Sequence, residues 1–260
     1  MQNTRLFPPL SLYIHFPWCI QKCPYCDFNS HALTEELPED RYITALLNDL
    51  AQDLAQFQGT RIIQSIFMGG GTPSLFSAQQ LDRLLIALQQ QLTFAEDIEI
   101  TLEANPSTFE SDKFVAYRAI GINRLSIGIQ SFNDEHLQRL GRIHSAQDAI
   151  RAVNIAKQAG FDNFNLDLMF GLPDSCEQDS LRDVQQAMEL QPSHISFYQL
   201  TLEPNTYFHK YPPALPGDDA IFNEQLACQK LLAEHGYQQY EISAYAQQGK
   251  QCRHNINYWS

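Results

Sequence analysis

Three cysteines follow one another closely near the N-terminus of the chain. Cys19, Cys23 and Cys26 stand in the spacing C-x3-C-x2-C, directly after an apolar run. Three thiolates can hold a four-iron cluster while one iron has no protein ligand, so that iron can bind an exchangeable small molecule. A zinc site completed by His15 or His31 and a redox dithiol are the alternatives. The spacing alone favours the cluster, then zinc, then the dithiol.

Small and polar residues stand at or near the ends of the later strands that the sequence predicts. The turn Gly69-Gly70-Gly71-Thr72-Pro73 lacks the lysine of a phosphate-binding loop, and its glycines let backbone groups approach a ligand. Glu103, Gln130, Arg142 and Asp167 occupy comparable positions further along the chain. Because the working residues of a parallel barrel lie at the C-terminal ends of its strands, these groups are expected on one face.

Each of these residues also has an ordinary structural role open to it. Asp167 could cap a helix or a turn, and Arg142 could form a surface ion pair. Glu103 and Gln130 could bond loop amides, and the glycines could form a plain tight turn. Together, however, they suit a zwitterionic ligand with a nucleoside, because a guanidinium pairs with a carboxylate and Glu or Asp accepts ribose hydroxyls. S-Adenosylmethionine (SAM) is such a ligand, and its amino and carboxylate groups can chelate an open iron.

Apolar, β-branched segments alternate with longer helical patterns along the chain. This alternation is typical of repeated βα units around a parallel sheet. The predicted strands are 10–16, 62–68, 98–103, 124–129, 164–169 and 194–200. The predicted helices are 40–57, 78–92, 111–119, 146–159, 178–190 and 218–234. Six such units predict an α/β fold in the form of a partial (βα)6 barrel of the TIM type, with a doubly wound sheet as the alternative.

Composition and charge exclude several classes of protein. The 260 residues include 17 basic and 30 acidic ones, and the formal charge of −13 opposes a broad contact with nucleic acid. Cys176, Cys228 and Cys252 are scattered and do not resemble a disulfide framework, which indicates a reducing compartment. No apolar run suits a signal peptide or a membrane span, so we expect a soluble cytoplasmic protein without a nucleic-acid partner.

The cysteine triplet and the glycine turn resemble those of the radical S-adenosylmethionine superfamily. More narrowly, the chain is similar to the HemW-type heme chaperones, which are relatives of the oxygen-independent coproporphyrinogen dehydrogenases. The resemblance covers essentially the whole chain. Its matching strings lie at 13–31, 103–106, 124–131, 165–169 and 254–259.

The resemblance implies that Cys19, Cys23 and Cys26 bind a [4Fe-4S] cluster. It also assigns nine residues to a SAM pocket: Tyr13, Tyr25, Gly70, Gly71, Thr72, Glu103, Gln130, Arg142 and Asp167. In such proteins the reduced cluster donates one electron to the sulfonium, which gives methionine and a 5′-deoxyadenosyl radical, while the protein positions this chemistry. Turnover would require an electron donor.

Two departures distinguish the chain from the dehydrogenases. Phe28 stands where those proteins carry a fourth cysteine, and only a short leader precedes Tyr13. Both differences favour a heme chaperone over an enzyme that decarboxylates porphyrinogen propionates. A zinc-stabilised barrel without redox chemistry is the alternative from a different class.

The string from His254 to Trp259 implies, by the same resemblance, a part in heme handling. Its candidate heme contacts are His254, Asn255, Asn257, Tyr258 and Trp259. An imidazole suits an axial position and aromatic rings suit a porphyrin face, while a merely packed histidine is the ordinary alternative. The resemblance further implies heme as cargo and an acceptor protein in the cytoplasm or at a membrane. Residues 1–245 are expected to form the barrel with its leader and cysteine loop, and 246–260 to begin a C-terminal region that relatives continue.

Overall fold

The computed structural model of the chain describes residues 9–56, 61–107 and 113–259. The strands are β1 Leu10–Phe16, β2 Trp18–Cys19, β3 His31–Ala32, β4 Ile62–Gly70, β5 Thr93–Ala104, β6 Arg124–Gln130, β7 Phe164–Phe170, β8 His194–Gln199, β9 Gln238–Glu241 and β10 Ala244–Ala246. The helices are α1 Glu39–Gln56, η1 Pro73–Leu75, α2 Ala78–Gln91, α4 Phe114–Ala119, α5 Asp134–Arg139, α6 Ala146–Gln158, α7 Glu177–Glu189, α8 Tyr207–Lys210, α9 Asp218–Glu234 and α10 Arg253–Asn257. The predicted helical positions 57, 111 and 112 lie outside the described residues.

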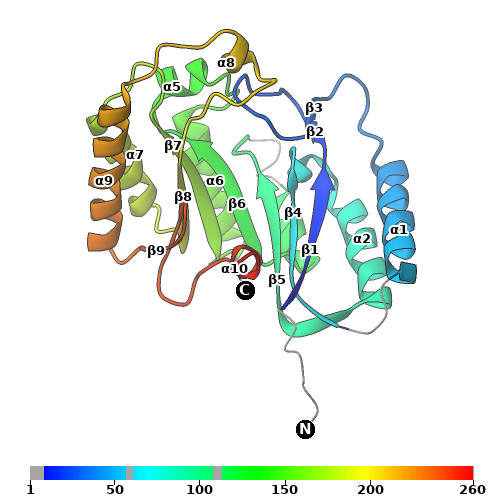
Figure 1. Cartoon of the computed structure of the whole chain (residues 1–260). Coiled ribbons are helices and arrows are strands. Elements are labelled where there is room, and N and C mark those ends of the chain that lie inside the picture. The colour runs from blue at the N-terminus through cyan, green and yellow to red at the C-terminus, as the bar shows by residue number, and fades with distance from the viewer. Residues whose placement is uncertain (1–8, 57–60, 108–112, 260) are drawn as a thin grey trace.

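Eight strands form one curved sheet in the order β1-β4-β5-β6-β7-β8-β10-β9. In this sheet β1, β4, β5, β6, β7 and β8 are parallel and follow chain order, whereas β10 is antiparallel to both β8 and β9. An order without reversal excludes a doubly wound sheet and confirms the predicted partial barrel. Figure 1 shows the strands fanning out with their C-terminal ends upward. The sequence did not indicate β9 and β10, because strands of four and three residues are too short to show a period.

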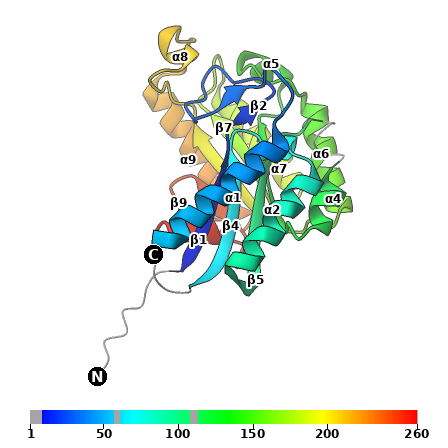
Figure 2. The same cartoon turned by 90° about the vertical axis from the view of Figure 1, so that its right-hand side faces the viewer.

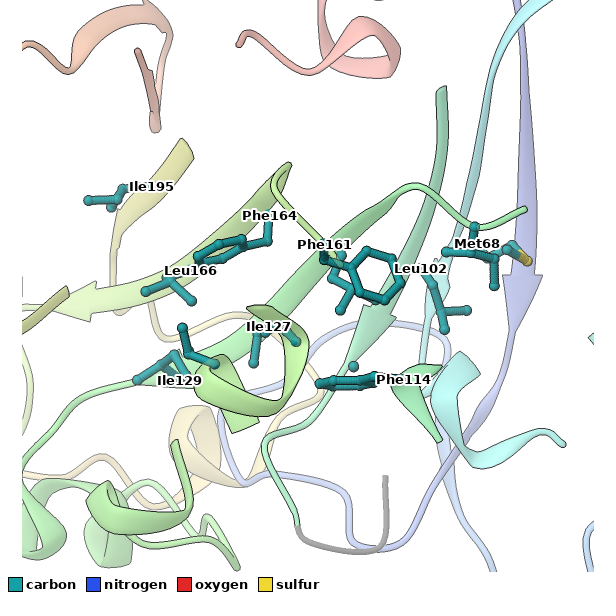
Figure 3. Packing of buried hydrophobic residues seen from close by; sticks show 14 of the residues in the cluster. Met68, Leu102, Phe114, Ile127, Ile129, Phe161, Phe164, Leu166 and Ile195 are labelled. Atoms are coloured by element: carbon teal, nitrogen blue, oxygen red, sulfur yellow. The ribbon is translucent and has the colours of Figure 1, made fainter. Parts of the chain in front are cut away.

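The two faces of the curved sheet differ in polarity, because successive side chains of a strand point to opposite sides. One face is apolar and packs against the helices that surround the sheet. Figure 3 shows part of this core, with Leu102, Ile127, Leu166 and Ile195 drawn from four neighbouring strands. Each of these side chains is fully buried and contributes roughly 1.5–3 kcal/mol relative to an exposed one.

The alternate positions point into the hollow of the sheet and are mostly polar. They include Thr101, Glu103, Ser126, Gln130, Asn165, Asp167, His194 and Ser196. The same strands that anchor the core therefore hold a row of polar groups inside the half-barrel. Outside it, α1 and α2 run side by side (Figure 2).

Helix α10 lies on the inner side of the sheet, where it contacts β4 and β1 (Figure 1). The His254 ring centroid is 5.1 Å from that of Phe67 and 6.2 Å from that of Tyr13. The segment that carries the predicted heme contacts is thus packed into the half-barrel.

Candidate functional site

The three cysteines lie in the loop between β1 and α1. The short strands β2 and β3 pair at the base of this loop. Nζ of Lys22 donates to the carbonyl oxygens of Phe28 and Ser30, which closes the loop on itself. The backbone N–H of Phe208 donates to the carbonyl of Pro24 at 3.0 Å and attaches the loop to the segment after β8. All three thiols are free and partly exposed.

The loop borders a cavity of about 340 Å³ at the C-terminal ends of the strands. The predicted residues that line it are Cys19, Cys23, Cys26, Tyr25, Gly70, Gly71, Thr72, Glu103, Gln130, Arg142 and Asp167. Strand register explains how they converge. Glu103 of β5 lies beside Ser126 of β6, and Asp167 of β7 lies between Gly128 and Ser196.

Tyr13 lies next to this cavity and not in it. Its hydroxyl is 3.1 Å from Nδ1 of His15. Tyr13 borders a smaller hollow of about 230 Å³, which shares Phe28, Gly70 and Glu103 with the main cavity. The reason is its place on the strand, since Tyr13 precedes the C-terminal end of β1 and faces α10.

The glycine turn lets two parts of the chain approach each other closely. A Cβ atom on Gly71 would lie 2.6 Å from the carbonyl oxygen of Phe16 and 2.7 Å from that of Trp18. The N–H groups of Gly71 and Thr72 donate to these two oxygens, each at 2.7 Å. Gly70 has a φ of +108°, and a Cβ there would collide with the His15 ring. The sequence predicted an approach to a ligand, and the structure adds that the glycines also join the turn to the cysteine loop.

Arg142 connects the cysteine loop with the sheet. Its Nη2 donates to Oδ1 of Asn105 at 2.6 Å and to the carbonyl of Gly128 at 2.9 Å, and its Nη1 lies 3.5 Å from Sγ of Cys23. Burial alone would lower the pKa of Arg142, but Tyr25 and Cys23 favour the cation, and the net pKa is raised. Within the described residues, Nε of Arg142 has no hydrogen-bond partner. The guanidinium therefore places a positive charge between the cysteine loop and the sheet, at the cavity that Arg142 lines.

Two carboxyl groups also line the cavity. Glu103 Oε2 accepts the N–H of Gly70 at 3.0 Å. Burial, together with the charge of Asp167, raises the pKa of Glu103 to about 8. Asp167 accepts from Oγ of Ser126 at 3.1 Å and from Nδ2 of Asn165 at 2.8 Å. Burial raises the pKa of Asp167, and these hydrogen bonds oppose the rise. The lining of the cavity thus includes an acidic pair and the Arg142 cation.

Tyr198 belongs to the cavity although the sequence analysis missed it. Its hydroxyl donates to Oε1 of Gln130 at 2.5 Å. Gln130 adopts a left-handed φ of 70° at the end of β6. Burial raises the pKa of Tyr198 well above its ordinary value, so the hydroxyl remains a donor. The sequence analysis found Gln130 because it lies at the C-terminal end of a strand. The same reasoning applies to Tyr198, which stands next to the last residue of β8.

The residues at this cavity fit a cluster and a nucleoside ligand better than a zinc ion. Three free thiols come from one loop, and Arg142, Asp167 and Glu103 line the same cavity. His15, one candidate for a fourth zinc ligand, instead places Nε2 2.8 Å from the carbonyl oxygen of Asn29.

Comparison with known proteins decides the family. Residues 13–185 match the sequence model of the Radical SAM superfamily. The chain belongs to the radical SAM superfamily. It is 58% identical over 255 residues to the heme chaperone HemW of Haemophilus influenzae and 57% identical over 252 residues to that of Escherichia coli. These matches cover 97% of the chain and 67% and 66% of the relatives, so the chain spans about two thirds of the curated proteins it matches.

A solved radical SAM enzyme has the same architecture. The structure of coproporphyrinogen III oxidase HemN from Escherichia coli matches with a TM-score of 0.84 and 28% identity, over 93% of this chain and 56% of that one. The predicted fold and the resemblance to HemW-type proteins are confirmed by these matches. In the described residues, no helix is long and apolar enough to cross a membrane.

Proposed function

We propose that this radical SAM chain is the barrel portion of a heme chaperone that binds a [4Fe-4S] cluster, SAM and heme and passes heme to an acceptor protein. The identity of 58% to a heme chaperone, over 97% of the chain, carries the proposal. The phenylalanine at position 28, in place of a fourth cysteine, supports carriage over decarboxylation. Residues 1–245 would form the barrel, and 246–260 would begin the C-terminal region of the whole protein.

In this proposal, Cys19, Cys23 and Cys26 hold the cluster at the cavity wall. The Arg142 guanidinium would pair with the SAM carboxylate, and Asp167 would accept from the ribose hydroxyls. Tyr25, Gly70–Thr72, Glu103 and Gln130 complete the pocket, with Tyr13 at its edge. When reduced, the bound cluster supplies one electron to the sulfonium, and an electron donor would then be a second partner.

The heme segment is only partly accessible in the structure. His254 is 5% exposed and its Nε2 lies 3.3 Å from the Tyr258 hydroxyl, whereas Tyr258 and Trp259 are 70% and 64% exposed. Burial, followed by the charge of Arg124, lowers the pKa of His254 to about 4, so its imidazole is neutral. Tyr258 and Trp259 would meet a porphyrin face first, and His254 would reach the iron after a shift of α10. Asn255 and Asn257 follow the histidine in the same helix.

A cytoplasmic location accompanies this proposal. The three cluster thiols must stay reduced, and all six cysteines of the chain are free thiols in the structure. The acceptor protein would be met in the cytoplasm or at a membrane surface.

Iron and sulfide analysis after anaerobic reconstitution tests the cluster. Replacing Cys19, Cys23 and Cys26 together by Ala should abolish the iron–sulfur absorption, while replacing Cys176, Cys228 and Cys252 by Ser should leave it. Of the latter three, Cys228 and Cys252 are buried and Cys176 is exposed. Full cluster occupancy in the triple Ala variant would refute the assignment.

Heme binding and coproporphyrinogen decarboxylation can be tested separately in a version of the protein extended past Ser260. We expect heme binding that weakens in His254→Ala, and no consumption of coproporphyrinogen III with cluster, reductant and SAM supplied. The likeness to HemN makes decarboxylation the competing function. Protoporphyrinogen formed above the level of an enzyme-free control would establish that function instead.

A further inference from the structure

An unbroken chain of hydrogen bonds crosses the hollow of the half-barrel below the cofactor cavity. It begins at the backbone N–H of Cys252, which donates to the Tyr240 hydroxyl at 3.1 Å. That hydroxyl lies 2.6 Å from Nε2 of His194, and Nδ1 of His194 lies 2.6 Å from Oδ1 of Asn165. Nδ2 of Asn165 then donates to Oδ1 of Asp167 at 2.8 Å. The chain thus joins the heme segment to a cavity residue.

Only one direction of donation satisfies every member of this chain. Its first group, a backbone N–H, can only donate, and its last group, the Asp167 carboxylate, accepts. Asn165 uses Nδ2 toward Asp167 and also toward Oγ of Ser126 at 2.8 Å, so its Oδ1 must accept from His194. His194 therefore carries its proton on Nδ1, and Nε2 accepts from the Tyr240 hydroxyl. Burial lowers the pKa of His194 well below its ordinary value, which keeps this single tautomer neutral.

The middle of the hydrogen-bond chain is shielded from water, and its far end is fixed in position. His194 and Asn165 are 1% and 2% exposed, so water cannot easily replace a lost partner. At the far end, Oε1 of Glu99 accepts the N–H of Arg253 at 2.9 Å, next to the bond between Cys252 and Tyr240. A change in the position of Asp167 would therefore be transmitted through short bonds to the start of α10.

We propose that Asn165, His194 and Tyr240 are positioning residues that couple the nucleoside end of the cavity to the segment 252–259. The coupling rests on the proposed function, in which Asp167 binds SAM. A ligand that holds Asp167 orders the segment through the hydrogen-bond chain, and an occupant of the segment changes SAM affinity by the same factor. The cavity and the heme segment thereby respond to each other through the hydrogen-bond chain.

Hydrogen exchange of the peptide covering 252–259 measures this coupling. The cluster-reconstituted chain is compared with and without SAM, anaerobically and without reductant, so that SAM is not cleaved. In the unaltered chain, SAM should slow exchange of these amides by about fivefold or more, the lower end of typical coupling factors. Tyr240→Phe removes only the hydroxyl and should abolish the slowing. SAM affinity should fall by less than about fivefold, because Asp167 keeps Asn165 and Ser126.

A second variant and a matched control make the result specific. His194→Asn retains a donor near the position of Nδ1 but nothing at Nε2, so it should also lose the slowing while SAM still binds. Tyr237→Phe removes another buried hydroxyl, which donates to the carbonyl of Pro192 at 2.7 Å outside the chain, and should behave like the unaltered protein. His194→Asn decides the result if Tyr240→Phe does not fold.

Two outcomes would overturn the coupling and leave SAM binding standing. One is slowing that persists in both Tyr240→Phe and His194→Asn, and the other is slowing lost equally in Tyr237→Phe. Absence of SAM binding to the unaltered, cluster-loaded chain would instead remove the ligand assignment and the coupling together.

Discussion

Asp167 is held in place before any ligand reaches it. Both of its oxygens accept hydrogen bonds, one from Ser126 of the neighbouring strand β6 and one from Asn165 of its own strand β7. A carboxylate fixed in this way loses little conformational freedom on binding, which favours affinity. The same residue lines the cavity.

Replacing Asp167 by Ala should weaken SAM binding about tenfold or more while the cluster content stays unchanged. A hydrogen bond to a charged group is worth roughly 1.5–3 kcal/mol, and about 1.4 kcal/mol corresponds to a factor of ten in affinity. Calorimetric titration of the reconstituted variant measures the effect. Asp219→Ala, an exposed position at the start of α9, serves as the control. An unchanged titration would limit Asp167 to holding Ser126 and Asn165.

Glu103 should make the ligand-free protein less stable as the pH rises. Its pKa is about 8 in the folded protein against 4.5 for the ordinary group, so between these values the folded state holds a proton that the unfolded state releases. The free energy of unfolding therefore falls as pH rises through this range, by about 1.4 kcal/mol for each unit of pKa difference at most. Below pH 4.5 both states are protonated and the effect disappears.

Urea unfolding of the wild type and of Glu103→Gln at pH 5 and pH 8 tests this dependence. Gln cannot ionise, and its amide oxygen can still accept the N–H of Gly70. We expect the wild type to lose stability relative to the variant between the two pH values. Parallel profiles would show that Glu103 is ionised in the folded protein near pH 5.

At the scale of elements, hydrophobic periodicity predicted the features that depend on a single segment of the chain, such as the range of each strand. The six parallel strands agree with the predicted ranges to within a few residues, except that β5 begins five residues early, at Thr93. Alternation also explains why Glu103, Gln130 and Asp167 converge, since strand ends of a parallel sheet share one edge. Each prediction of this kind needed only the sequence of one element.

Other features depend on relations between distant elements and could not be predicted. The level of Tyr13 relative to the cavity depends on the place of β1 in the sheet, and the packing of α10 on β4 depends on the curvature of the barrel. The hydrogen-bond chain through Asn165, His194 and Tyr240 joins residues 29 and 46 positions apart. No spacing rule connects residues across such separations.

Helix α7 holds the turn that follows β6, and so acts on the cavity from outside. Asp183 Oδ2 accepts from Oγ of Ser131 at 2.6 Å, and Oδ1 accepts from the N–H of Phe132 at 2.8 Å. Burial raises the pKa of Asp183 to about 6. Gln130 immediately precedes this turn. We therefore expect the position of its side chain to depend on the hydrogen bonds that Asp183 accepts.

Asp183→Ala should lower the free energy of unfolding by about 1–3 kcal/mol, because two buried donors lose their acceptor. SAM affinity should fall as well, since the position of Gln130 relaxes. Urea denaturation and titration with SAM provide the two measurements. Gln185→Ala, on the exposed side of the same helix, should change neither quantity. Loss of stability with unchanged SAM affinity would mean that the hydrogen bonds of Asp183 stabilise the fold but do not affect the cavity.

At the scale of the whole molecule, the cavity lies at one end of the half-barrel, and α10 packs against the inner side of the sheet. The cysteine loop is attached to parts of the chain far from it in sequence, since Gln21 Nε2 donates to the carbonyl of Gly141 at 3.0 Å and Arg142 contacts Cys23. A ligand bound between the loop and the strand ends therefore joins the first and the middle thirds of the chain. Ligand binding at such a place stabilises the fold as a unit.

SAM should accordingly raise the melting temperature of the cluster-loaded chain. At a free concentration of 100 times the dissociation constant, binding adds about 2.7 kcal/mol to the free energy of unfolding. For a chain of this size about 1 kcal/mol shifts the midpoint by roughly 2–4 °C, so we expect a rise of about 5–10 °C.

At the same SAM concentration, Asp167→Ala with tenfold weaker binding should retain about half of this rise, since the added free energy becomes about 1.4 kcal/mol. The variant without Cys19, Cys23 and Cys26 should show little change, because it lacks the open iron that the amino and carboxylate groups of SAM would chelate. Equal shifts in all three proteins would mean that SAM binds elsewhere than at the cavity.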